Sequence, residues 1–412
     1  MKNFSLLICS ICAVCELSAQ VTLEAYRDSV FVNSYEMAIA DEQVSRSYSV
    51  MKKSYADFLP SLDGEASVGT SLRRMDDEKL WFFDISPRIS QTLLGGGVRA
   101  TYRQSQSQLR GAMYDAEYVR RTMLYEADYA YWSLSAMGFY KEAVKEYFAI
   151  VKSLADVVQE RFDAGYVAKS DLLQVQARRS EAEYAVVASQ KDYDVALHRF
   201  NNLRGVDETT TTYLAESILD SLPMPRRVSY NEMIEARADV QSAREAIYAA
   251  EWGVGVMRAK YNPTVNVSIR GSWQTYSPNL SNRTFVDGAV MLGVSVPLFH
   301  WGERRQAVAI ANSDLQIAEH RWEQMCSDAE QEEADGWSAL QSSYMQMQSS
   351  LQNLRIAQEN LSISTFSYRE GQATVLDVLQ AQISWLQIYT NAITARFNYA
   401  VAVSAYHFIT SM

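Results

Sequence analysis

The sequence has little cysteine, and most of it lies at one end. Three of the four cysteines fall within the first twenty residues, which leaves Cys326 for the rest of the chain. These first residues combine a positive start, an apolar stretch and a small-residue cleavage site, so they predict a signal peptide over residues 1–20. The exported chain would therefore have no internal disulfide, and its stability must come from packing or assembly.

Glycine and proline are also scarce, at 17 and 7 of 412 residues. A chain of this length ordinarily suggests two or three globular domains, but residues that punctuate such domains are too few here. No stretch after residue 20 has the ~18 consecutive apolar residues of a transmembrane helix. The net charge of −11 argues against nucleic acid as a partner.

Patterns that would indicate catalysis are missing as well. The four histidines are scattered, without ligand-like spacing to one another or to Cys326. The glycine run at 95–97 lacks the Lys-Ser/Thr of a phosphate-binding loop. We therefore expect no enzyme activity, no metal site and no cofactor.

What the sequence does contain is a helical hairpin written twice. Gly165 aligns with Gly371 and Asp171 aligns with Asp377, both at an offset of 206 residues. In each copy a helical pattern runs into a glycine, the usual residue of a left-handed helix end, and a carboxylate begins the next apolar run six residues later. Each copy predicts a tight reversal between two helices.

The offset recurs along most of the chain, which indicates an internal duplication. Gly97, for example, aligns with Gly302 at an offset of 205. We predict a first structural repeat over 21–205 and a second over 230–412, each with two strands and long helices. Residues 206–229 fit neither the helical nor the strand period, so they predict an irregular linker between the repeats.

Four segments alternate between apolar and polar residues with a period of two. Their residue ranges are about 62–73, 81–90, 264–274 and 286–296. Such lengths suit a tilted strand that crosses a bilayer, which needs ~9–11 residues with lipid on one side and water on the other. A half-buried strand of a soluble sheet gives the same alternation, and alternation alone favours that reading. Aromatic residues near both ends of the strands favour the membrane, and these are Trp81, Phe82, Phe83, Trp273, Tyr276, Phe285, Tyr55, Phe58, Tyr261, Phe299 and Trp301.

The remaining segments predict helices. One covers 22–57 and ends before Pro60, and two very long ones cover 99–162 and 303–369. At 1.5 Å per residue, ~65 residues of helix extend about 100 Å, too far for the core of a globular domain. Shorter helices over 171–204 and 374–409 would return alongside, so the chain predicts a coiled coil or a tube.

If the strands cross a bilayer, one chain is incomplete. The edges of a four-stranded sheet would leave backbone groups unpaired in hydrocarbon at several kcal/mol each, so a barrel must close. Because the smallest spanning barrels have about eight strands, closure needs at least two chains, and physics alone leaves two and three open.

The duplicated Gly-x5-Asp hairpins and the strand-to-helix junctions, at 90–97 and 295–302, resemble those of the TolC-type outer-membrane efflux proteins. The resemblance covers essentially the whole chain after the signal peptide. It implies a homotrimer with a 12-stranded β-barrel in the outer membrane, continued by a 12-helix α-barrel in the periplasm of a Gram-negative bacterium. It also implies a passive exit duct that contacts outer-membrane lipid and works with a periplasmic adaptor and an inner-membrane pump of the RND, ABC or MFS type, for efflux or type I secretion.

By the same resemblance the hairpins form the periplasmic tip, with Gly165 and Gly371 where the adaptor binds. Asp377 stands where family members can carry an acidic ring, while Gln380 replaces a second acidic position. Tyr368, Asp171 and Ser170 match positions that can link neighbouring helices, and Ala373 replaces an arginine of that network. Gly97 and Gly302 mark the barrel-to-tunnel junction.

Two alternatives compete with this interpretation. Both hairpin aspartates lie where a carboxylate stabilises the first turn of a helix by ~0.3–1 kcal/mol, and Thr374 with Asp377 has the spacing of a capping box. For the whole chain, the alternative is a periplasmic or secreted coiled-coil scaffold without channel activity, in which the strands form a small soluble sheet.

Overall fold

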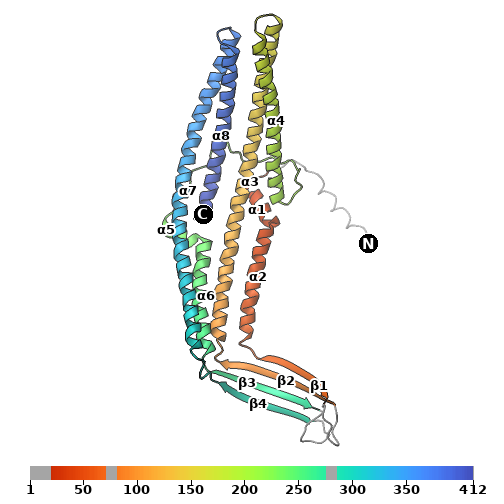
Figure 1. Cartoon of the computed structure of the whole chain (residues 1–412), viewed down its shortest axis with the longest axis vertical. Coiled ribbons are helices and arrows are strands. Elements are labelled where there is room, and N and C mark those ends of the chain that lie inside the picture. Colours follow the sequence, from red (N-terminus) through yellow and green to blue (C-terminus); the bar gives the residue numbers. More distant parts are fainter. Residues whose placement is uncertain (1–19, 71–80, 275–284, 412) are drawn as a thin grey trace, which may run out of the picture. The chain divides into compact units, whose positions relative to one another are not determined.

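A computed structural model describes residues 20–70, 81–274 and 285–411 (Figure 1). The predicted signal peptide lies outside these residues, except for Gln20, and so do Tyr276 and the side chains of Trp81, Phe82 and Phe285. The chain forms two compact units, one containing residues 38–118 and 234–329 and the other the remainder. Each unit therefore takes segments from both halves of the sequence.

The first unit holds one antiparallel sheet of four strands in the order β1-β2-β3-β4 (Figure 1). The strands are β1 (Ser61–Thr70), β2 (Trp81–Leu94), β3 (Thr264–Gln274) and β4 (Phe285–Ser295). The four predicted strands are confirmed, with β2 longer than predicted, while residues 71–73 of the first predicted strand lie outside the described residues. Strands β2 and β3 join the two halves of the sequence by direct pairing, for example Ile89 with Ile269.

The register of the sheet places the apolar residues of all four strands on one face. Leu62 pairs with Ile89, Ile89 with Ile269, and Ile269 with Val290. Because directly paired residues share a face, one continuous apolar surface crosses the sheet. This surface is uncovered, with Val290 exposed by 74% and Leu62 by 72%. An apolar face of this extent is typical of contact with lipid or another protein.

The opposite face is polar and is joined by hydrogen bonds. Ser272 donates to an oxygen of Asp84 at 3.1 Å, and Arg270 donates to the hydroxyl of Ser86 at 3.4 Å. The sheet thus has one polar face and one apolar face, as the alternation predicts.

Helices α2 (Tyr35–Ala56) and α6 (Ala238–Lys260) complete this unit, together with the first parts of α3 (Val98–Asp163) and α7 (Glu303–Arg369). The prediction of a single helix over 22–57 was wrong. Ser34 has extended backbone angles and separates α1 (Leu23–Asn33) from α2. Its hydroxyl accepts a hydrogen bond from the amide of Met37 at 3.3 Å, so Ser34 acts as the N-cap of a new helix.

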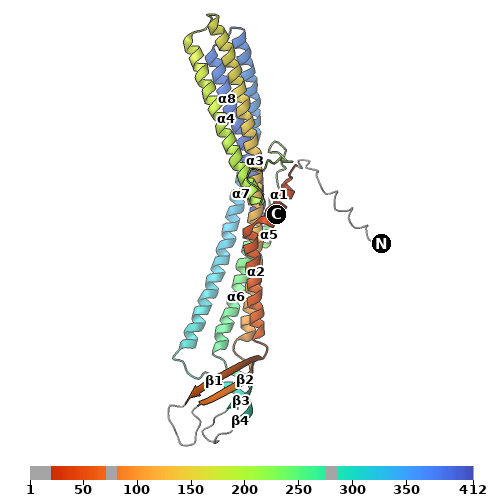
Figure 2. The same cartoon turned by 90° about the vertical axis from the view of Figure 1, so that its right-hand side faces the viewer.

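The second unit contains α1, α4 (Lys169–Leu203), α8 (Val375–Thr410) and the later parts of α3 and α7, while the short α5 (Tyr230–Ala236) lies at its boundary. Helices α3 and α4 run side by side as an antiparallel pair, and so do α7 and α8 (Figures 1 and 2). The ranges confirm both predicted long helices and both return helices. Among the described residues, no helix has both the length and the apolar composition needed to cross a membrane.

An aromatic core holds the second unit together. Tyr26 of α1 stacks on Phe200 of α4 with ring centroids 4.0 Å apart, and Tyr131 of α3 packs against both rings. Two ion pairs add to this packing. Arg27 donates to both oxygens of Asp128, and Arg227 donates to both oxygens of Glu333.

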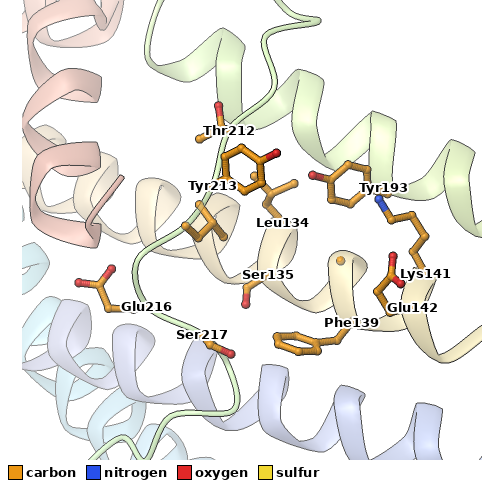
Figure 3. Close-up of a pocket in the computed structure, with 12 residues that line it drawn as sticks. Leu134, Ser135, Phe139, Lys141, Glu142, Tyr193, Thr212, Tyr213, Glu216 and Ser217 are labelled. Atoms are coloured by element: carbon orange, nitrogen blue, oxygen red, sulfur yellow. The ribbon is translucent and has the colours of Figure 1, made fainter. Parts of the chain in front are cut away.

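Residues 206–229 have no helix or strand beyond a single bridge at Leu214. The segment passes over α3, where the hydroxyl of Ser135 accepts from the amide of Ile218 at 3.1 Å. A cavity of about 290 Å³ lies here (Figure 3). Two carboxylates, Glu142 and Glu216, line it. Glu216 accepts hydrogen bonds from the Tyr131 hydroxyl and the Leu23 amide, which makes it a packing residue.

Candidate functional site at the ends of the helical hairpins

The two predicted reversals exist and have the same geometry. After α3, the amide of Gly165 donates to Phe162 at 2.9 Å and the amide of Tyr166 donates to Arg161 at 2.8 Å. After α7, Gly371 donates to Tyr368 at 3.1 Å and Gln372 donates to Ser367 at 2.8 Å. Both pairs are the bonds of a Schellman motif, which satisfies carbonyls at a helix end.

Glycine is required in both turns by backbone conformation. The φ angles of Gly165 and Gly371 are +77° and +74°, in the left-handed region that disfavours other residues. A Cβ atom at either position would meet nothing within 4 Å, so conformation rather than space selects glycine. Both turns are exposed to solvent.

The helices that follow the turns begin differently. In the second hairpin, Asp377 and Thr374 form a capping box, in which the Thr374 amide donates to Asp377 at 2.8 Å and the Asp377 amide donates to Thr374 at 3.3 Å. Hydrogen bonds from the Thr374 hydroxyl and amide lower the pKa of the exposed Asp377 carboxyl. Asp377 therefore carries a negative charge at the end of the hairpin, and it also caps α8.

In the first hairpin the N-cap is Ala168, which provides no side-chain bond. Asp171 lies in the first turn of α4, where its charge favours the helix dipole, and it accepts a long hydrogen bond of 3.4 Å from Ser170. Ser170 is exposed, as is Gln380 on α8, whereas Asp171 is half-buried.

Tyr368 differs from the other predicted site residues because it is buried, with 5% of its surface exposed. It packs with Leu154, Val158 and Val378 between the two hairpins. Its hydroxyl has no hydrogen-bond partner among the described residues, so the structure of the single chain does not join Tyr368 to Asp171 or Ser170.

Arg161 makes a polar contact between the hairpins that the sequence did not predict. Its guanidinium donates to the carbonyls of Tyr368 at 3.3 Å and Arg369 at 3.0 Å, and it lies 4.6 Å from the centre of the Tyr368 ring. Arg161 aligns with Ser367 in the second repeat, so it is not among the residues that the two repeats share. A cation in the last turn of a helix was the available signal.

The predicted junction glycines lie directly before the two long helices. Gly97 has φ +73° and precedes Val98 at the start of α3, and Gly302 has φ +85° and precedes Glu303 at the start of α7. Glu303 accepts a hydrogen bond from the hydroxyl of Tyr261 at 2.6 Å, and this bond lowers the pKa of the Glu303 carboxyl. No group of three or more metal-ligating side chains occurs in the described part of the chain.

Comparison with known proteins agrees with this geometry. Residues 27–206 and 229–406 match the model of the outer membrane efflux protein family. CyaE of Bordetella pertussis is 27% identical over 72% of this chain, and the match spans 64% of CyaE. The outer membrane efflux protein BepC of Brucella suis is 21% identical over 95% of this chain and 84% of BepC.

The fold is that of solved outer-membrane channels. The Campylobacter jejuni CmeC outer membrane channel superposes with a TM-score of 0.84 and 19% identity, over 94% of this chain and 85% of CmeC. The predicted mixed fold of long helices with a small membrane-type sheet is therefore confirmed, as is an outer-membrane location. Such proteins are transport channels rather than enzymes. With both halves of the sequence matching its model, the chain belongs to the outer membrane efflux protein family.

Proposed function

We propose that this chain forms the outer-membrane exit duct of a tripartite efflux or type I secretion system. The observation that carries the proposal is the sheet, because its exposed apolar face crosses all four strands while its other face is polar. A secreted coiled-coil scaffold would not require an exposed apolar face on its sheet. Water on the polar face and lipid on the apolar face suit the wall of a duct.

The duct is a homotrimer. Strands β1 and β4 each have one edge without a partner among the described strands, and such edges cannot remain open in hydrocarbon. Three copies would contribute twelve strands and close the barrel, and the helical pairs of the three copies would continue it as an α-barrel. The two repeats that we propose, 21–205 and 230–412, then make each chain pseudo-symmetric.

The hairpin ends form the periplasmic entrance, where an adaptor and an inner-membrane pump of the RND, ABC or MFS type deliver cargo. Exposed turns at Gly165 and Gly371 are accessible for adaptor contact. A threefold axis would bring three Asp377 carboxylates together at the narrowest point. Within each copy, the Thr374 hydrogen bonds lower the pKa of Asp377 and so favour its ionised form. Gln380, one turn further along α8, adds no charge.

Single-channel recording in a planar bilayer tests both the duct and the entrance. Asp377→Asn keeps an oxygen that can cap α8 but removes the charge, so we expect a changed conductance and weaker block by a trivalent cation. Glu183→Gln, on the exposed face of α4 away from the turns, serves as the matched charge control and should behave as wild type. Identical block in wild type and Asp377→Asn would leave Asp377 as a helix cap only. Absence of any channel would contradict the duct itself.

A further inference from the structure

A cavity of about 600 Å³ lies within the second unit and extends from the hairpin ends along α3, α7 and α8. It is bounded by α3 on one side and by α7 and α8 on the other. Its walls are largely apolar, with Ile150, Leu154, Leu361 and Val378 among them. Cavities of ~300–1,000 Å³ with apolar walls and few polar groups are typical of small-molecule sites.

Two buried polar side chains line this cavity. Gln382 is 1% exposed and Tyr368 is 5% exposed. The Oε1 atom of Gln382 and the hydroxyl of Tyr368 have no hydrogen-bond partner among the described residues. A buried polar atom without a partner costs about 1–3 kcal/mol, so two of them in one cavity call for an explanation.

Helix direction brings the two groups toward the same level of the cavity. Side chains on a helix lean toward its N-terminus. Tyr368 lies at the end of α7, so its ring leans away from the hairpin turn. Gln382 lies on the second turn of the antiparallel α8, so its amide leans toward that turn. One group can donate a hydrogen bond, and the other can accept one.

We propose that this cavity binds an uncharged amphiphile whose apolar body carries both a hydrogen-bond donor and an acceptor. The acceptor would take the hydrogen bond of the Tyr368 hydroxyl, and the donor would bond to Oε1 of Gln382. A charged group at this depth would lose its hydration without gaining a buried counter-ion, which selects a neutral ligand. Glu146 and Arg369, both exposed, also line the cavity and mark its open side.

Occupancy would affect the hairpins because the cavity walls belong to both of them. A ligand that contacts α3 and bonds to α7 and α8 fixes the spacing between the first and the second hairpin. The site itself does not depend on the proposed transport function, and its test uses no transport measurement.

The test is photoaffinity labelling of the intact detergent-solubilised protein with 4-hydroxybenzophenone, whose ketone accepts and whose hydroxyl donates. Labelled peptides should map to residues 146–157 and 361–382, with a saturable dose response. In Tyr368→Phe and in Gln382→Met the half-saturating concentration should rise about 3- to 10-fold, the effect of losing one buried hydrogen bond. 4-Methylbenzophenone, which lacks the donor, should bind wild type and Gln382→Met equally.

Two matched controls change the same residue types outside the cavity. Tyr166→Phe alters an exposed tyrosine of the first turn, and Gln380→Met alters an exposed glutamine of α8. Both should label as wild type does. The proposal is overturned if labelling is confined to other segments, or if the cavity variants bind the probe as tightly as wild type. Each of the two cavity variants carries the test alone if the other fails to fold.

Discussion

Replacing Arg161 should loosen the entrance of the duct. Arg161 is the residue through which α3 holds the end of α7, by two hydrogen bonds to carbonyls and by its position over the Tyr368 ring. Any opening that separates the two hairpins must break these contacts. In Arg161→Ala these contacts are absent from both the open and the closed channel, so the closed channel loses the stabilisation that they provide.

The magnitude follows from three terms. A cation at a helix C-terminus contributes ~0.3–1 kcal/mol, an exposed cation–π contact ~0.5–1 kcal/mol, and each hydrogen bond of a half-buried group about 0.5 kcal/mol after allowance for solvent. These terms overlap, and we take their net effect as about 1–2 kcal/mol. This shifts the ratio of open to closed channels about 5- to 30-fold toward the open state.

Single-channel recordings at fixed voltage and salt measure this ratio as the open fraction. Arg161→Lys is the informative companion because lysine keeps the charge but lacks the planar fork that reaches two carbonyls, so it should also raise the open fraction. Lys169→Ala removes a positive charge from the same hairpin and should leave the ratio unchanged. An unchanged open fraction in Arg161→Ala would refute the reasoning. A wild-type open fraction in Arg161→Lys together with a changed one in Lys169→Ala would show that charge alone matters.

Three further predictions concern the membrane face, the turns and the ion pairs. Val290→Arg places a charge on the apolar face of β4 and should cost about 2–4 kcal/mol in the bilayer, so less protein should be recovered in the outer-membrane fraction. Met291→Arg, on the opposite face of the same strand, is the control and should be recovered normally. Gly371→Ala forces a side chain onto a φ of +74° and should lower the stability by about 1–2 kcal/mol in thermal melts. Gly64→Ala, in a strand with open space around it, is the control and should leave the stability unchanged. Equal effects of the two substitutions would rule out backbone strain at Gly371. Glu333 has its pKa held below the usual value of 4.5, first by the hydrogen bond from Arg227 and then by that from Tyr406, so its stabilising effect is complete above pH 4.5 and is lost as the pH falls through the lower folded-state value. Thermal melts across this range should show a smaller acid-induced loss in Glu333→Gln than in wild type, and parallel curves would contradict the assignment.

The elements that the sequence predicted well are those specified by local pattern. Alternation located all four strands, and glycine with the following apolar run located both turns. Both signals are local, because hydrophobic periodicity and the need for glycine at a positive φ depend on residues that are adjacent in the sequence. The register then showed what alternation alone cannot, namely that the apolar sides of all four strands share one face.

The features that the sequence did not reveal depend on partners far along the chain or on a single cap. The helical period continues through Ser34, so nothing in the period marks the break that its hydroxyl creates. Arg161 bonds to carbonyls more than 200 positions away, and no local pattern encodes such a contact. Asp377 had two possible roles from sequence, and the structure supplies the capping geometry while the constriction role stays a prediction.

The central claim is that three copies of this chain close one barrel in the outer membrane. The most direct measurement is the protein mass of the complex extracted in mild detergent from the outer-membrane fraction, by native mass spectrometry or light scattering. We predict three chain masses in that fraction. A monomer or dimer recovered from the soluble periplasmic fraction would contradict it, because the apolar face of the sheet would then never meet lipid.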